Sequence, residues 1–453
     1  MTPPHEQPGT TLRDRPIVAI SPHPEDLLPL VHSATRATLV CCASVHDYLA
    51  NPVVAGFSLE DTDRIRRPWG PRHLDQLARY AQVAVNAVAD PDTPVLVVPW
   101  AASPAWRAVT GQWPGLVELA DISHGTVAEL ADKAILRDHL LRLGIPVPPY
   151  LVQAAAALVH QRITGKLGTP FLLQVPTPAT GHDISLIEST DDLHRMLNAR
   201  PDVTRWIVSN LPGRSTLTYQ ALVDTETVTV NAPSTRLSSI SETGAPPGVY
   251  CGAVYGPHDH LDPDTVRAGR ELTDTIGAWL AGRGYRGAFH VDYVLTDYGP
   301  HLLDLHLGPH ASVTLQSEFD AERGQQPLLI RHLDAVLGRR ATRTTSPAPT
   351  RPITQLELRS TRPEHTVRYS PPAGLYRVAH DRLVEHHRGL TGPPGPDSDL
   401  IRVSGAPRPG TRLTPGATLA RITTSCPLTT PDGTELTDTG KRWIRAVRSV
   451  VSC

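Results

Sequence analysis

The chain has 453 residues, 40% of them hydrophobic, so it is long enough to form two to four packed domains. Its 43 basic and 45 acidic residues give a net charge of −2 and only 5% of its residues are aromatic, which argues against nucleic-acid binding. A polar N-terminal segment, no apolar run as long as a membrane span and five cysteines without a CxxC pair argue against a membrane or disulfide-rich protein. We therefore expect a cytoplasmic, multidomain α/β and α+β protein.

The first 120 residues alternate short apolar runs with a helical stretch. After a polar segment over 1–14, which we expect to be disordered, the pattern predicts strands over 16–21, 37–44 and 94–100 and an amphipathic helix over 73–89. Near-continuous apolar strands separated by helices are typical of a parallel sheet covered on both faces. We expect a small α/β domain over 15–120.

The pattern of predicted elements changes from about residue 121, where helices are followed by strands of alternating polarity, as in antiparallel sheets. The segment 121–338 predicts a second body of the protein. Its expected helices are 127–143, about 153–167, 190–199, 263–282 and 321–337, and its expected strands are 169–176, 184–188, 206–213, 215–224, 227–237, 287–297 and 300–307. Residues 339–353 have the composition of a linker, and 354–453 predict a small α+β domain that ends in a helix.

Lysine is rare in this chain. Only Lys133, Lys166 and Lys441 occur among 43 basic residues, and Lys133 follows Asp132 at the start of a helix. An ammonium group is a compact charge on a flexible stem and suits a phosphate oxygen. Lys133 is therefore a candidate nucleotide contact.

Acidic residues interrupt the last predicted strand pair. Asp292 lies in FHVDYVL, and Asp304 lies two residues before His306 on the same face of its strand. If the strands pair, two carboxylates converge, and a cation such as Mg²⁺ would neutralise them. The alternative is that each aspartate is a solvated strand residue.

Other kinds of site are poorly supported. The sequence has no GxxxxGK[ST] phosphate loop, no GxGxxG fingerprint at the first strand and no GxSxG nucleophile turn. PHDHLD, with His258 and His260, could hold a metal but is more often a solvated loop. His301, His306 and His310 could suggest zinc, although 21 histidines make such groups common.

Four segments, in this order, resemble the ATP-grasp superfamily of carboxylate ligases. The first, ADKAILRDHLLRLGIPVPPY, is similar to the helix that carries a phosphate-binding lysine. The others are similar to the phosphate-gripping strand and loop, the adenine-binding hinge and the paired metal-binding strands; they are GTPFLLQVPTPATGHDISLIESTDDL, WIVSNLPGRSTLTYQALVD and GAFHVDYVLTDYGPHLLDLHLGPHAS. The resemblance implies a two-lobed ATP-grasp body over 121–338 that follows a pre-ATP-grasp domain over 15–120.

The resemblance also implies roles for individual residues. It puts Lys133 on the ATP phosphates, with Gln174 at the position of a second lysine. Further residues of the implied site are Gly181 in the phosphate loop; Val208, Ser209, Asn210 and Leu211 as the backbone that reads adenine; and Asp292, Asp304 and His306 as ligands of Mg²⁺, His306 replacing the usual asparagine.

The sequence departs from the family pattern where positive charge is expected. Gln174 carries no charge, Gly181 stands alone in a loop that is usually glycine-rich, and Gly308 replaces a common arginine. The missing charge could come from elsewhere in the chain. The candidate catalytic residues are then Arg236, Arg286 and His310, with Arg214 as a further source of charge.

The implied reaction is ATP-dependent amide-bond formation from a small carboxylate and an amine, through an acyl phosphate. The divergent motifs resemble the pheganomycin-type peptide ligases most, and such ligases are often homodimers. The first alternative is a decayed nucleotide site in a non-catalytic binding or structural protein. The second is a metal-dependent hydrolase that uses the histidine clusters.

Overall fold

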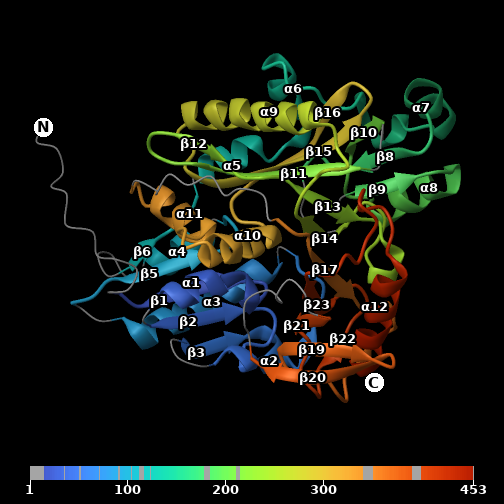
Figure 1. Ribbon diagram of the computed structural model, residues 1–453. Coiled ribbons are helices and arrows are strands. Elements are labelled where there is room, and N and C mark those ends of the chain that lie inside the picture. Colours follow the sequence, from blue (N-terminus) through green and yellow to red (C-terminus); the bar gives the residue numbers. More distant parts are fainter. Residues whose placement is uncertain are drawn as a thin grey trace, which may run out of the picture.

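The structure is a computed structural model. It consists of an N-terminal α/β part, a small antiparallel lobe and a body built on one long antiparallel sheet that includes the C-terminal strands (Figure 1). The residues that it describes are 15–34, 36–49, 53–70, 72–89, 92–103, 105–111, 117–122, 124–177, 184–210, 215–339, 350–389 and 399–451.

The N-terminal part contains a five-stranded sheet in the order β3-β2-β1-β5-β6, and every pairing in it is parallel. Apolar residues of α3 pack on one face, and α1, together with helices from later in the chain, packs on the other. This confirms the predicted parallel sheet. The elements are β1 (Ile17–Ser21), β2 (Ala37–Cys41), β3 (Val53–Ser58), β5 (Val95–Pro99), β6 (Val117–Leu119), α1 (Leu28–Ser33), α2 (Leu59–Asp63), α3 (Arg72–Val88) and α4 (Ala105–Gly111).

The small lobe is a four-stranded antiparallel sheet, ordered β7-β10-β8-β9, with two helices beside it. Its core gathers apolar side chains such as Ile163, Phe171, Leu193 and Trp206. The expected helix over about 153–167 was partly wrong, because its first residues finish a strand. The elements are β7 (Tyr150–Ala154), α7 (His160–Leu167), β8 (Phe171–Gln174), β9 (Ile184–Ile187), α8 (Thr190–Ala199) and β10 (Arg205–Asn210).

The long sheet runs in the order β16-β15-β11-β13-β14-β17-β23-β21-β19-β20, with β12 paired to β11. The helix α9 lies across β11 and β12 at the top of the view in Figure 1, and its bounds match the expected 263–282. Its elements are β11 (Thr216–Val223), β12 (Val228–Val230), β13 (Ser234–Ser238), β14 (Tyr250–Tyr255), α9 (Pro263–Gly282), β15 (Gly287–Thr296), β16 (Gly299–Leu307), β17 (Ile353–Arg359), β19 (Gly374–Ala379), β20 (Arg382–Arg388), β21 (Leu400–Ser404) and β23 (Thr418–Thr424).

Strand pairing continues across the segment expected to be a linker. Strand β14 pairs with β17, so the strands on either side of 340–349 belong to one sheet, and those ten residues lie outside the described part of the chain. The domain boundaries at 120 and 338 stay predictions. A three-stranded sheet of β4 (Ile65–Arg66), β18 (His365–Thr366) and β22 (Arg412–Leu413) also ties the N-terminal part to the C-terminal one, and the chain's last described helix is α12 (Asp438–Val450).

Two further helices of the structure differ from the expected ones. The helix expected over 127–143 is two helices, α5 (His124–Leu130) and α6 (Lys133–Arg142), because Asp132 adopts an extended backbone and its side chain accepts the N–H groups of Ala134 and Ile135. The helix α10 (Ala311–Glu322) was missed, since it buries polar residues such as Ser317 and Asp320 and shows no apolar stripe. Only α11 (Leu328–Val336) matches the predicted 321–337.

In the part of the chain that the structure describes, none of the helices is both long and apolar enough to span a bilayer.

Candidate functional site

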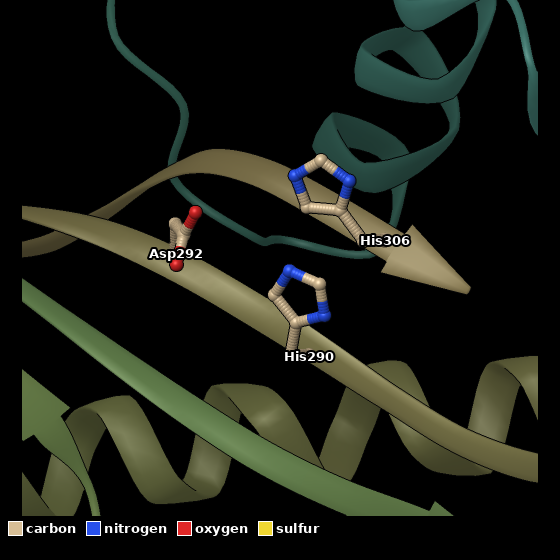
Figure 2. A group of neighbouring side chains, drawn as sticks. All are labelled: His290, Asp292 and His306. Atoms are coloured by element: carbon tan, nitrogen blue, oxygen red, sulfur yellow. The ribbon is translucent and has the colours of Figure 1, made fainter. Parts of the chain in front are cut away.

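The paired strands β15 and β16 bring the predicted acidic residues together. Asp292 lies opposite Asp304 and His290 lies opposite His306 in an antiparallel register. Residues two apart share one face of a strand, so all four side chains lie on the same side of the sheet. Figure 2 shows His290 and Asp292 projecting from β15 toward His306 on β16. The sequence-based expectation that the strands pair is confirmed.

Lys133 contacts this hairpin directly. Its Nζ atom lies 2.5 Å from Oδ2 of Asp304, and Nε2 of His306 lies 3.1 Å from the same oxygen. Burial by itself would raise the pKa of Asp304, but the neighbouring His306 and Lys133 outweigh it and hold that pKa well below its ordinary value. Asp304 is therefore an ionised carboxylate that fixes the end of the lysine side chain.

Asp292 is held by two other residues. The hydroxyl of Thr218 donates to its Oδ1 at 2.5 Å, and Nε of Arg236 lies 3.3 Å from its Oδ2. Arg236 comes from β13 and also lies over the ring of Tyr250, 6.0 Å from its centroid. The predicted residue Arg236 is thus part of the cluster, where it places a positive charge beside a buried carboxylate.

His310 lies next to His290 and farther from His306. Its ring centroid is 4.2 Å from that of His290, and its Nδ1 accepts the backbone N–H of Ser312 at the start of α10. Burial lowers the pKa of His310 and of His290, and the neighbouring imidazoles lower both further. Both rings are therefore neutral at pH 7.

Gln174 lies in the same region and is joined to a residue that the sequence analysis missed. Its Oε1 accepts a hydrogen bond from Nη2 of Arg137 at 3.1 Å, while Nη1 of Arg137 donates to the hydroxyl of Ser209 at 2.6 Å. Arg137 is 4% exposed and lies over the ring of Tyr150. A guanidinium therefore stands beside the glutamine that replaces the expected lysine.

The predicted adenine-binding hinge residues differ in whether their backbone groups are free to bind a base. Val208 and Ser209 belong to β10, which is paired on one side with β7 and on the other with β8. Their backbone groups are therefore engaged in the sheet and are not free to bind a base. Asn210 ends the strand and donates its N–H to Pro149, while Leu211 and Gly181 lie outside the described residues.

The structure does not bring Arg286 into the cluster. It precedes β15, and its Nη1 donates to the carbonyl oxygen of Tyr285. Six residues of extended chain, about 20 Å, separate it from Asp292. Arg286 as a source of positive charge therefore stays a prediction.

Two residues could have been found from the sequence. Arg137 follows Lys133 by four positions, the spacing that puts two side chains on one face of a helix. His290 precedes Asp292 by two positions, so it shares a strand face with it. The long-range partners of both residues were not visible in the sequence.

The described residues contain one group of three or more histidine, cysteine or acidic side chains whose ligand atoms lie within 4.8 Å of one another, namely His290, Asp292 and His306. His258 and His260 are adjacent, with ring centroids 6.1 Å apart, but belong to no such group. Asp292 and Asp304 face each other on the paired strands and suit Mg²⁺, which is commonly bound through one or two carboxylates together with phosphates.

Comparison with known proteins finds a similarity in fold rather than in sequence: no protein-family model and no curated protein matches the sequence. The biotin carboxylase domain of Hydrogenobacter thermophilus 2-oxoglutarate carboxylase, solved with MgADP, ADP and bicarbonate, superimposes with a TM-score of 0.60 at 12% identity, over 91% of this chain and 86% of that one.

Two further solved structures give the same result. Biotin carboxylase from Campylobacter jejuni, solved with a β,γ-ATP compound, has a TM-score of 0.58 at 13% identity and covers 90% of this chain and 87% of its own. Carboxyaminoimidazole ribonucleotide synthase from Aspergillus clavatus, solved with ATP, has a TM-score of 0.55 at 12% identity and covers 96% and 99%. These proteins are ATP-grasp enzymes, and the chain has their fold.

Proposed function

We propose that the chain is an ATP-dependent ligase that joins a small carboxylate to an amine. The observation that carries the proposal is the contact between Lys133 and Asp304 across two separate elements, α6 and β16. A phosphate-binding cation and a metal-binding carboxylate would need to lie this close to act on one nucleotide.

The ion pair also explains how the site would stay intact without nucleotide. Lys133 and Asp304 are both mostly buried, and an isolated buried charge is costly, so each neutralises the other. A nucleotide phosphate would compete with Asp304 for the ammonium group. The carboxylate thus released would be available to a cation.

Arg137 supplies a positive charge beside Gln174, where the family pattern has a lysine. The uncharged Gln174 lacks the positive charge expected there, but the guanidinium of Arg137 lies within hydrogen-bonding distance of it. A guanidinium has five donor N–H groups, and the contacts to Ser209 and Gln174 use two of them. Arg137 is therefore suited to share the negative charge of a triphosphate with Lys133.

Mg²⁺ would be held by Asp292 and Asp304, and when bound it would neutralise charge on the terminal phosphates. This chain's own residues would do the rest by position and charge. In the proposed reaction a substrate carboxylate oxygen bonds to the γ-phosphorus of ATP and ADP leaves. The amine then bonds to the acyl carbon, and phosphate leaves with the proton that the amine nitrogen gives up. Arg236, beside Asp292, would offset negative charge on the acyl phosphate.

The finer parts of the proposal rest on the sequence. The resemblance favours a peptide-type substrate pair like that of the pheganomycin-type ligases and a homodimeric assembly, and the composition and cysteine pattern favour a cytoplasmic location. His310 lies beside His290, and because its Nδ1 is engaged at the start of α10, any direct part in the reaction would fall to its Nε2.

Thermal stability in the presence of Mg-ATP tests nucleotide binding. At a ligand concentration about 100 times the dissociation constant, binding stabilises the folded state by about 2.7 kcal/mol. Lys133→Met and Arg137→Met should each reduce the shift in melting temperature, whereas Lys166→Met, at an exposed lysine of α7, should retain it. The absence of any shift for the wild type would refute the ligase.

A non-catalytic binding protein is the rival, and one observation favours it. Lys133 and Asp304 are paired with each other, and Arg236 is paired with Asp292, so the charges of the cluster are already balanced. The two functions separate in one assay. A ligase releases ADP and phosphate when a mixture of amino acids is supplied, and Asp304→Asn abolishes that release while nucleotide binding persists; a binding protein releases none.

A further inference from the structure

The β15–β16 hairpin carries two imidazoles and a carboxylate that lie side by side on one face, with His290 and Asp292 buried and His306 partly exposed (Figure 2). From this arrangement we propose that His290, Asp292 and His306 form a binding site for a divalent transition-metal ion such as Zn²⁺ or Co²⁺. The site is available without nucleotide and does not depend on the proposed ligase activity.

The main reason for proposing a metal site is that His290 is buried without hydrogen-bond partners in the described part of the chain. His290 is 1% exposed, and neither of its ring nitrogens has a hydrogen-bond partner among the described residues. Buried polar groups in folded proteins are nearly always satisfied, and leaving one without a partner is costly. A metal ion at a ring nitrogen would satisfy this residue, which packs against His306 with ring centroids 4.4 Å apart.

The kinds of donor atom select the class of metal. Two neutral imidazole nitrogens and one carboxylate oxygen suit Zn²⁺, Co²⁺ and similar ions, whereas Mg²⁺ prefers oxygen ligands only. Asp304 is not part of the group, and its Oδ2 contacts both Nζ of Lys133 and Nε2 of His306. His306 would therefore bind the ion through Nδ1, or through Nε2 in exchange for its contact with Asp304. The set that holds the transition metal therefore shares Asp292 with the aspartate pair proposed for Mg²⁺ and differs from it by the two imidazoles.

The geometry requires a small adjustment. The three ligand atoms lie within 4.8 Å of one another, while tetrahedral zinc with bonds of about 2.1 Å separates its ligands by about 3.4 Å. The planes of His290 and His306 are 10° apart, so their lone pairs run side by side and do not yet converge. Rotation about the Cβ–Cγ bond, which has a broad energy well, can turn the rings toward a shared ion.

Asp292 can join the site without losing all its contacts. Its Oδ1 accepts from Thr218, which leaves Oδ2 as the metal ligand in place of the 3.3 Å contact with Arg236. Arg236 keeps its position over Tyr250 and toward the carbonyl of Gly248. The ion would thus replace one positive charge beside Asp292 with another.

The test is a Co²⁺ titration of the full chain after treatment with a chelator, in the presence of a large excess of Mg²⁺ and without nucleotide. We expect one equivalent of Co²⁺ to bind and to give the visible absorption bands of a site with nitrogen ligands. His290→Asn and His306→Asn should each weaken binding by more than about 100-fold, since even loss of a residue that only supports a ligand costs 10- to 100-fold.

Matched variants make the outcome specific. The double variant His258→Asn and His260→Asn removes the other adjacent histidine pair and should bind Co²⁺ like the wild type. Lys133→Met should also bind Co²⁺, even though it impairs nucleotide binding, so that failure of the metal site and failure of the ligase proposal can be told apart.

The proposal is overturned if the wild type binds no Co²⁺, if excess Mg²⁺ displaces it, or if binding survives in His290→Asn and His306→Asn. X-ray absorption of the Co²⁺-loaded wild type decides the question even if these variants do not fold. Two imidazole ligands are expected, and a shell made only of oxygen would overturn the site.

Discussion

His332 should make the folded protein lose stability in mild acid. This residue of α11 is 2% exposed, and its Nδ1 accepts the backbone N–H of Ala288 at 2.9 Å, at the start of the strand that carries His290 and Asp292. Burial lowers its pKa from the ordinary 6.5 to about 4. In the folded protein the ring therefore stays neutral to well below pH 6.

The sign of the effect follows from proton binding. Between pH 6.5 and about 4 the unfolded chain holds a proton on this imidazole and the folded chain does not, so acid favours unfolding. The contribution of the neutral His332 is complete above pH 6.5 and is lost as the pH falls toward 4. At about 1.36 kcal/mol for each pH unit, the loss is about 3 kcal/mol.

The comparison of His332→Asn with the wild type isolates this group from the other buried histidines. Asparagine can keep an oxygen acceptor for the Ala288 N–H and does not titrate. In urea unfolding followed from pH 7.5 to 4, the difference in free energy of unfolding should change by about 3 kcal/mol in favour of the variant. His386→Asn, at an exposed position in β20, is the control and should show no such change. A difference that does not vary with pH would refute the reasoning.

Three further changes test how the fold supports the site. Asp132→Ala removes the cap of α6 and should cost about 1 kcal/mol in urea unfolding, whereas Asp132→Asn should cost less; equal losses would contradict the cap. Gly252→Ala would place a methyl group 2.1 Å from the carbonyl oxygen of Gln355 at the β14–β17 pairing and should destabilise the chain by at least about 1–3 kcal/mol. In Gly282→Ala the added methyl group would have no heavy atom within 4 Å, so the melting temperature should stay unchanged or rise.

Much of the fold follows from short-range patterns. The strands of the parallel sheet and the helix α9 are visible in the sequence because apolar residues recur at the periods of strands and helices over several turns. The order of four motifs also indicated the fold that the solved structures share. Patterns failed where burial did not follow an apolar stripe, as in α10, and where one side-chain hydrogen bond ended a helix, as at Asp132.

The candidate site was also predictable only in part. The sequence by itself determined which chemical groups were present and which shared a strand face: Asp304 with His306, and a lysine at the head of a helix. The tertiary structure decided which groups meet. It put Lys133 on Asp304 and Arg137 beside Gln174, and it turned Arg286 to the carbonyl oxygen of Tyr285. It also buried His290 so that both its ring nitrogens lack a hydrogen bond from the described residues. These outcomes depend on contacts between residues far apart in the chain, which local periodicity does not encode.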